Sequence, residues 1–328
     1  MKGLLKHLST LLVLSYLHTA LSEVVVEFSP KCKGFFLDET TPNIPGILLD
    51  GTAQKHYKPI CQLFNNVYRY ATLYDTTNRI PVFSAYTFIG TGDDSIKRPA
   101  WKIEPQLDEE NDANMALAKP GINYPNQAVK EDYVGAEVVN RGHMFPNEHA
   151  HDAESKNSTF TLTNCVPQAV SSNAFSWCKM EQSVKKILEN NCKDANNKIK
   201  AYVVTGAVPS NGNTLKNRVN IPSHLWSAYC CYNRKLDKWM AKAYWSENVA
   251  EECGKKRLIP LTLTDLYKNL TVIYPGGKVS VFPQQCSSDF QLRLADEDFD
   301  PDGKDRGRDG YGQEEDDACA CPSGRAVE

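Results

Sequence analysis

The 328-residue sequence predicts an α+β protein whose main body is a mixed or antiparallel central sheet with flanking helices. Short runs rich in β-branched and aromatic residues recur along the chain, and each is bounded by Gly, Pro or Asn, as strands usually are. One later segment repeats its apolar residues at helical spacing. No long linker and no internal repeat divides the central part of the sequence, so we expect one domain of roughly 250 residues.

The first 22 residues have the composition of a secretory signal peptide. Lys2 and Lys6 precede an apolar run from Leu8 to Leu17, and small residues follow at a cleavage site. The run is shorter than the roughly 20 apolar residues that span a bilayer, and no later stretch is long or apolar enough. We therefore expect a secreted, extracellular protein without a membrane span, whose mature chain begins near Glu23.

Eleven cysteines in an exported chain predict a disulfide framework, because the secretory compartments are oxidising. Their number is odd, so at least one thiol is free or paired between chains. Adjacent Cys230 and Cys231 on a strand would point to opposite faces and therefore bond to different partners. The spacing contains no CxxC, which argues against the usual structural zinc site.

Two sequons predict N-glycosylation of a secreted chain. Asn157-Ser-Thr and Asn269-Leu-Thr both fit the acceptor rule, and both are expected on exposed loops. The sequence leaves open whether either sequon is used.

Seven segments have the composition of strands, and one has the period of a helix. The expected strands are residues 24–28, 79–89, 136–139, 201–205, 225–232, 239–245 and 279–282. The expected helix opens near Asn173, after which Met180, Val184, Ile187 and Leu188 follow the i, i+4, i+7, i+8 rule. Alternation of such segments predicts helices packed on a sheet.

The end of the chain differs in charge from its body. Residues 296–328 contain twelve acidic and four basic side chains, a net charge of −8, whereas residues 23–295 carry +3. With so little apolar content, the acidic tail is expected to be disordered. Five of its residues match a calcium-loop template: Asp298, Asp300, Asp302, Gly303 and Asp309. No amphipathic helix follows them, which favours a solvated tail over a calcium site.

The segment NRGHMFP, residues 140–146, contains the most informative side chains of the sequence. A histidine has an ordinary pKa of roughly 6.5, so a neutral His143 can take a proton from water at physiological pH. Arg141, two residues earlier, can bind a phosphate. Together they point to phosphodiester cleavage, although a lone histidine beside an arginine is more often structural.

Taken with the rest of the chain, this segment resembles the DNA/RNA non-specific endonucleases. The resemblance rests on Arg79 in NRIPVFSAYTF, the RGH of residues 141–143, TLTNCVPQ at 161–168, and Asn173, Trp177 and Glu181 in an Asn-x3-Trp-x3-Glu pattern. HMFPNEHAHD, VVTGAVPS and NRVNIPSHLWSAYCC are similar to the endonuclease domain-containing 1-like group of vertebrates within that family. The match spans roughly residues 30–286, inside an expected nuclease domain of residues 23–295.

The resemblance implies a ββα-metal nuclease that cleaves DNA and RNA with little sequence preference. His143 would be the general base, and Arg79 and Arg141 would bind the phosphate. Asn173 would be a neutral oxygen ligand for Mg²⁺, or for Mn²⁺ or another divalent cation. Glu181, about 80° around the same expected helix, would hydrogen-bond the waters around the ion.

Three further polar residues complete the implied site. Asn164 is expected to support it, and Asn140 replaces the aspartate that opens the family's motif. Lys185 replaces an arginine that the family commonly has four residues after the helix glutamate, and it could pair with Glu181 at i, i+4. Both replacements put the rate and the metal preference in doubt more than the reaction type.

Other functions remain open on the sequence alone. The two replacements also fit a nuclease fold that has lost activity and acts as an extracellular binding module, and the tail allows a calcium-binding matrix protein. His143, His149 and His151 could suggest a zinc site, but their spacing fits no common motif. Trp177 is expected in the core. The oligomeric state is not predicted.

Overall fold

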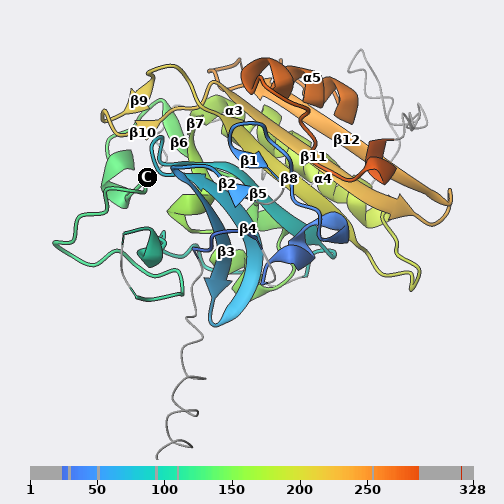
Figure 1. The fold of residues 1–328 in the computed structure, drawn as a ribbon, viewed down its shortest axis with the longest axis horizontal. Coiled ribbons are helices and arrows are strands. Elements are labelled where there is room, and N and C mark those ends of the chain that lie inside the picture. The colour runs from blue at the N-terminus through green and yellow to red at the C-terminus, as the bar shows by residue number, and fades with distance from the viewer. Residues whose placement is uncertain are drawn as a thin grey trace, which may run out of the picture.

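A six-stranded antiparallel sheet forms the centre of the computed structural model (Figure 1). In spatial order its strands are β12 (Lys238–Glu247), β11 (His224–Asn233), β8 (Ala201–Val208), β5 (Ile80–Phe88), β4 (Val67–Asp75) and β3 (Tyr57–Phe64). Each neighbouring pair runs antiparallel. The predicted α+β class with an antiparallel sheet is therefore confirmed.

The structure describes residues 24–28, 31–49, 52–92, 95–108, 111–252, 255–287 and 319. The expected signal peptide and, apart from Cys319, the acidic tail with its calcium-loop match lie outside these residues, so the statements about them stay predictions. Within the described ranges, no helix combines the length and the apolar character needed to cross a membrane.

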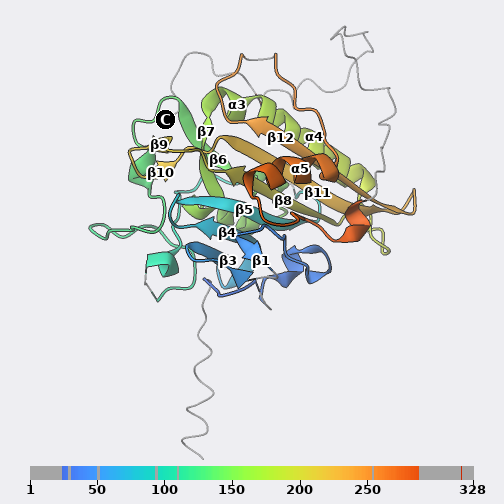
Figure 2. The ribbon, with the colours of Figure 1, turned by 45° about the horizontal axis from the view of Figure 1, so that its top comes forward.

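Helices cover both faces of the sheet. Helix α4 (Ser176–Asn191) packs on one face and helix α5 (Leu263–Ile273) on the other (Figure 2). Neighbouring residues Val203 and Val204 of β8 belong to different apolar clusters because side chains alternate along a strand. Figure 2 thus shows three layers, with the sheet buried between them.

The helical period after Asn173 identified the buried side of α4 correctly. Met180, Val184 and Leu188 are buried in the apolar cluster between α4 and the sheet, and Ile187 packs against this cluster. Trp177, also expected in the core, is 1% exposed. Burial of this apolar stripe is what fixes the helix on the sheet.

Smaller elements connect these layers. They are β1 (Leu48–Leu49), β2 (Thr52–Ala53), β6 (Val139–His143), β7 (Cys165–Ala169), β9 (Thr214–Leu215), β10 (Val219–Asn220), α2 (Ala153–Ser158), α3 (Val170–Ala174) and seven single turns of 3-10 helix, among them η5 (Asn147–His149). β6 pairs only with β7, and this hairpin stands beside the main sheet.

Three expected strands were wrong or misplaced. Residues 24–28 and 279–282 form only isolated bridges, and the strand expected at 136–139 begins at its last residue and runs through His143. β3 and β4 were missed, although Asn65 and Asn66 between them have φ of 51° and 59°, as in a two-residue hairpin turn. A strand needs a neighbour to bond to, which composition alone does not provide.

Four disulfides confirm the expected framework. They join Cys32 to Cys61, Cys178 to Cys319, Cys192 to Cys231 and Cys230 to Cys286. Adjacent Cys230 and Cys231 bond to different partners, as the alternation of a strand predicts. Cys165 is a buried free thiol whose pKa burial raises to about 12, so it stays protonated at physiological pH.

The two sequons lie on helices, which corrects the expectation of exposed loops. Asn157 is in α2 and Asn269 is in α5, and both side chains are half-buried. The backbone carbonyl of Asn157 accepts a hydrogen bond from Lys102 Nζ at 2.9 Å. Use of the sequons stays a prediction.

Gly206 provides a test of packing in the sheet. A Cβ at this position of β8 would lie 2.4 Å from two ring carbons of Trp226 and 2.5 Å from the carbonyl oxygen of Val82. Neither neighbour has room to move, so we expect Gly206→Ala to lower the free energy of unfolding by about 3 kcal/mol in urea denaturation. Gly34→Ala, where a Cβ meets nothing within 4 Å, is the control. Equal losses in the two variants would contradict this explanation.

Candidate active site

The candidate site is built on a ββα unit that contains the NRGH sequence. Strand β6 pairs antiparallel with β7, which sets His143 opposite Cys165 and Asn140 opposite Gln168. Helices α3 and α4 follow β7 directly in the chain. The NRGH residues therefore lie on strand β6. Helix α3, which contains Asn173, begins directly after strand β7 of the same hairpin.

Gly142 is required by the close approach of the two strands. A Cβ at this position would lie 2.0 Å from Oε1 and 2.7 Å from Cβ of Gln168. Any side chain there would push β6 away from β7. The glycine between Arg141 and His143 thus has a packing reason that the sequence alone did not reveal.

Arg141 and His143 share one face of the hairpin, because alternate residues of a strand point to the same side. The rings of His143, Trp101 and Phe160 contact one another in a triangle: the imidazole centroid is 4.9 Å from each of the other two, which are 5.2 Å apart. The guanidinium carbon of Arg141 is 5.3 Å from the centroid of the Trp101 ring and 5.4 Å from that of Tyr133. We call these rings and the two basic side chains the His143 face.

His143 is neutral in this environment. Burial lowers its pKa to about 3, and the positive charges of Arg98 and Arg141 act in the same direction. Its Nε2 atom is buried and has no hydrogen-bond partner among the residues that the structure describes. The ring therefore has an unpartnered nitrogen, whose hydrogen bond a water or ligand that enters the site would complete.

Asn140 and Asn173 meet on the opposite face of the hairpin, which we call the amide face. Asn173 Nδ2 donates a hydrogen bond of 2.7 Å to Asn140 Oδ1, which leaves the Oδ1 atom of Asn173 free for another contact. The side-chain amide of Gln168 and the hydroxyl of Ser172 are buried nearby in the chain without hydrogen-bond partners in the described structure. Sequence reasoning gave no role to either residue.

The amide face has the donor types that suit a divalent cation. Among the described residues, no group of three or more His, Cys, Asp and Glu side chains is placed to hold a metal ion. The free Oδ1 of Asn173 and the orphaned oxygens of Gln168 and Ser172 are neutral hard donors, which suit Mg²⁺ with most of its waters retained. The residue types fit the ion, with Asn173 as the most exposed ligand.

The helix after Asn173 differs from the expected one. Helix α3 ends at Ala174, and Phe175 between α3 and α4 has φ −126° and ψ −85°, far from helical values. Asn173 and Glu181 therefore lie on two helices, and the expected angle of 80° between them does not apply. Asn173 contacts β6 through Asn140, three residues before His143, and one common site for Asn173 and His143 stays a prediction.

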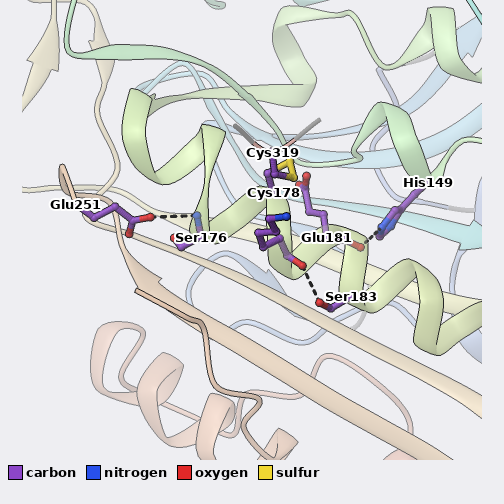
Figure 3. Close-up of a disulfide and its surroundings, with 8 residues drawn as sticks. His149, Ser176, Cys178, Glu181, Ser183, Glu251 and Cys319 are labelled. Atoms are coloured by element: carbon purple, nitrogen blue, oxygen red, sulfur yellow. Dashed lines mark hydrogen bonds between the residues drawn. A yellow bond between two sulfur atoms is a disulfide. The ribbon is translucent and has the colours of Figure 1, made fainter. Parts of the chain in front are cut away.

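Glu181 lies on α4 in a second group of polar side chains (Figure 3). Burial, and next the nearby carboxylate of Glu148, raise the pKa of Glu181 well above its ordinary value. Cys178, bonded to Cys319, is three residues earlier on the same helix face. Lys185, one turn later, forms no ion pair with Glu181 among the described residues, which corrects the expected i, i+4 pair.

His149 ties the turn η5 to α4. Its Nε2 lies 2.9 Å from the backbone carbonyl of Glu181, and its Nδ1 lies 2.7 Å from the hydroxyl of Tyr86. Because a carbonyl only accepts, Nε2 must carry the proton and Nδ1 must accept from Tyr86. Both nitrogens are occupied, so His149 is not available to a zinc ion.

Arg79 is engaged with backbone carbonyls rather than open to a phosphate. Its Nε donates to Pro125 O at 2.7 Å and its Nη1 to Arg218 O at 2.9 Å. The backbone of Arg79 has φ 56°, at the turn that leads into β5. A role for Arg79 in phosphate binding therefore stays a prediction that the contacts do not favour.

Asn164 is buried and has four hydrogen bonds. Its Oδ1 accepts from Ser84 Oγ at 2.9 Å and from Phe145 N at 3.0 Å. Its Nδ2 donates to Phe145 O at 3.1 Å and to Thr159 O at 3.0 Å. These bonds fix the chain just after His143 to strand β5, and the role of Asn164 in support of the site stays a prediction.

The DNA/RNA non-specific endonuclease family matches residues 52–265 of this chain. The chain belongs to that family. It is 31% identical over 215 residues to the Endonuclease domain-containing 1 protein of Homo sapiens, and 31% identical over 209 residues to that of Mus musculus. Each match covers 61% of this chain, but only 39% of the human and 38% of the mouse protein.

Two other comparisons are weaker. A nuclease of Nostoc is 28% identical over 87 residues, which is 26% of this chain and 29% of that protein. A crystal structure of the EndoG/EndoGI complex aligns with a TM-score of 0.45 at 18% identity, over 64% of this chain and 84% of the other. The family assignment rests on the match over residues 52–265.

The buried His149 predicts a loss of stability in acid. Its pKa falls from roughly 6.5 in the unfolded chain to about 4 in the folded one, mainly through burial. The unfolded state therefore binds more protons between these values, so stability is full above pH 6.5 and falls as pH decreases. We expect this residue to remove about 2 kcal/mol of unfolding free energy between pH 7.5 and pH 5, measured by urea denaturation.

His149→Gln is the matched variant for this measurement, because its amide can still donate to Glu181 O. The variant will be less stable at neutral pH, but its stability should change less between pH 7.5 and pH 5. The same pH dependence in both proteins would exclude His149 as the cause.

Proposed function

We propose that this chain is a secreted, metal-dependent endonuclease that hydrolyses phosphodiester bonds of DNA and RNA without strong sequence preference. Membership of the non-specific endonuclease family supports a nuclease. Four disulfides fit a protein that folds in an oxidising compartment. The observation that carries the proposal at the level of residues is the buried His143 with an unpartnered Nε2, on rings against which the guanidinium groups of Arg98 and Arg141 also lie.

His143 acts in this proposal as the general base. Its unpartnered Nε2 accepts a proton from a water as the water oxygen forms a bond to phosphorus. The bond from phosphorus to the 3′ oxygen breaks, and solvent protonates the leaving oxygen. The product with a 5′ phosphate follows the resemblance to the family.

A bound phosphate improves this base. With a pKa of about 3, His143 is neutral but has little affinity for a proton. A phosphate diester that binds near Arg98 and Arg141 brings a negative charge, which offsets the two positive charges and raises the pKa of the imidazole. The base thus becomes stronger only when substrate is present.

Asn173 is the residue proposed to hold the divalent cation, with the buried oxygens of Gln168 and Ser172 beside it in the chain. When bound, such an ion supplies positive charge that stabilises charge developing on phosphate oxygens. Mg²⁺ is proposed first, and Mn²⁺ suits the same donors.

Replacement of the base tests the proposed activity. We expect His143→Ala to lower the rate of plasmid nicking in Mg²⁺ by at least about 100-fold, the usual contribution of a general base, while the thermal unfolding transition is kept. His151→Ala is the control, since His151 is exposed and eight residues further along the chain. EDTA should stop cleavage by the unmodified protein.

Each outcome of this assay has a distinct meaning. Undiminished nicking by His143→Ala would remove His143 as the base. A wild-type chain that binds DNA but does not cleave it in Mg²⁺ or Mn²⁺ would refute the nuclease and identify a binding module.

Asn140 offers a gain-of-function test of the amide face. In Asn140→Asp a carboxylate would accept the hydrogen bond from Asn173 Nδ2 and add a negative charge beside the proposed ion. We expect the Mg²⁺ concentration for half-maximal nicking to fall by about 10-fold, as for other groups that support a metal ligand. Asn211→Asp adds the same charge at an exposed position. An unchanged Mg²⁺ midpoint in Asn140→Asp would place the ion elsewhere.

A further inference from the structure

Arg98 lies on the His143 face, although no feature of the sequence singled it out. Its guanidinium carbon is 6.0 Å from the centroid of the Phe160 ring. That ring is edge-on to His143 at 4.9 Å. Arg98 itself is exposed. The side chain thus stands at the rim of the candidate site, on the Phe160 side of the imidazole.

Arg98 and Arg141 approach the imidazole on different aromatic rings. Arg141 is held over Trp101 and Tyr133, whereas Arg98 is held over Phe160. Neither arginine forms an ion pair with any residue that the structure describes. Two positive charges that converge without a counter-charge repel each other, and an anion between or beside them removes this cost.

Two buried polar atoms on the same face also have no partner. They are Nε1 of Trp101 and Nε2 of His143, neither of which has a hydrogen-bond partner in the described part of the chain. An indole N–H donates only, so it suits an acceptor such as a phosphate oxygen or a water. The face therefore combines two guanidinium groups with an unused donor, a set that suits oxyanions.

We propose that Arg98 binds a backbone phosphate of the nucleic acid next to the phosphate held by Arg141. This deepens the proposed nuclease function and rests on it. Each guanidinium group lies against its own aromatic ring, Arg141 on Trp101 and Arg98 on Phe160, and the centroids of these two rings are 5.2 Å apart, so the two arginines suit neighbouring phosphates of one strand. Arg98 thereby makes the enzyme prefer polynucleotides to small diesters.

Arg98 also supplies a planar fork that position 185 lacks. Lys185, where the resemblance implies an arginine, lies close enough to His149 to lower the pKa of that imidazole. A lysine is a point charge, whereas guanidinium can bind two phosphate oxygens at once. The strongest phosphate contacts are therefore expected from the two arginines of the His143 face.

Salt-dependent binding measures this contact without cleavage. Single-stranded DNA would be titrated in EDTA at several salt concentrations with wild type, Arg98→Ala, Arg98→Lys and Lys97→Ala. Each lost phosphate contact makes the slope of log affinity against log salt less steep by about 0.7. We expect that change in Arg98→Ala, but not in Arg98→Lys, which keeps the charge. Lys97→Ala removes the same charge from the exposed neighbouring residue and should leave the slope as in wild type.

Cleavage provides the second readout. Arg98→Ala should lower kcat/KM on an oligonucleotide by about 10-fold, and should lower it much less on bis(p-nitrophenyl) phosphate, a single diester. Arg98→Lys should lose part of the oligonucleotide activity, because it lacks the fork. Thermal unfolding of each variant identifies any loss of folding.

The outcomes separate this inference from the nuclease proposal. A salt slope in Arg98→Ala equal to those of wild type and Lys97→Ala would overturn the role of Arg98, even in an active enzyme. Equal losses on the oligonucleotide and the small diester would do the same. A wild-type chain without any cleavage would refute the nuclease function, while the binding slopes still decide whether Arg98 contacts phosphate.

Discussion

The candidate site depends on the antiparallel pairing of β6 with β7. The register sets Asn140 opposite Gln168, and the approach of Gln168 leaves space only for a glycine at position 142. Alternation along the strand then turns Arg141 and His143 to one side and Asn140 to the other. A slip of one residue would exchange the two faces, so this register decides which side chains meet.

Charges of opposite sign are separated by this unit. Arg98 and Arg141 surround a neutral imidazole on the His143 face, with no carboxylate paired to them in the described residues, whereas Glu148 is the nearest charged influence on Glu181. Burial is the main cause that lowers the pKa of the histidine and raises that of the glutamate, and the charges of like sign nearby act in the same direction. The His143 face therefore has positive charge without a paired carboxylate among the described residues, which an anionic ligand would offset.

The sequence predicted those elements whose signals are local. β5, β8, β11 and β12 have β-branched and aromatic runs between turn residues, and the apolar period of α4 is regular. Residues 24–28 have a similar composition but form only single bridges, Val24 with Ile60 of β3 and Glu27 with Thr52 of β2, and Val26 is 84% exposed. The break at Phe175 involves no Gly or Pro, so it follows from packing around α3 and α4 and not from local preference.

The residues of the candidate site also fall into those that short sequence patterns predict and those that only the folded chain reveals. His143, Arg141 and Asn173 were found because short patterns contain them, but their placement on two faces depends on a hairpin register that no pattern states. Arg98 and Trp101 are about forty residues from His143 in the sequence, and only the ring contacts of the folded chain bring them to it. Gln168 was part of a matched stretch, yet its unsatisfied amide became visible only with its burial.

Asn140 shows how a chain can keep the geometry of a site while the charge of that site changes. Asn173 donates to the side-chain oxygen of residue 140, and an aspartate offers the same acceptor at that position. The replacement therefore preserves the orientation of Asn173, with its Oδ1 free, and removes only a negative charge. Since attraction between a divalent ion and a carboxylate is far stronger than that between the ion and an amide, the expected consequence is weaker ion binding in an unchanged framework.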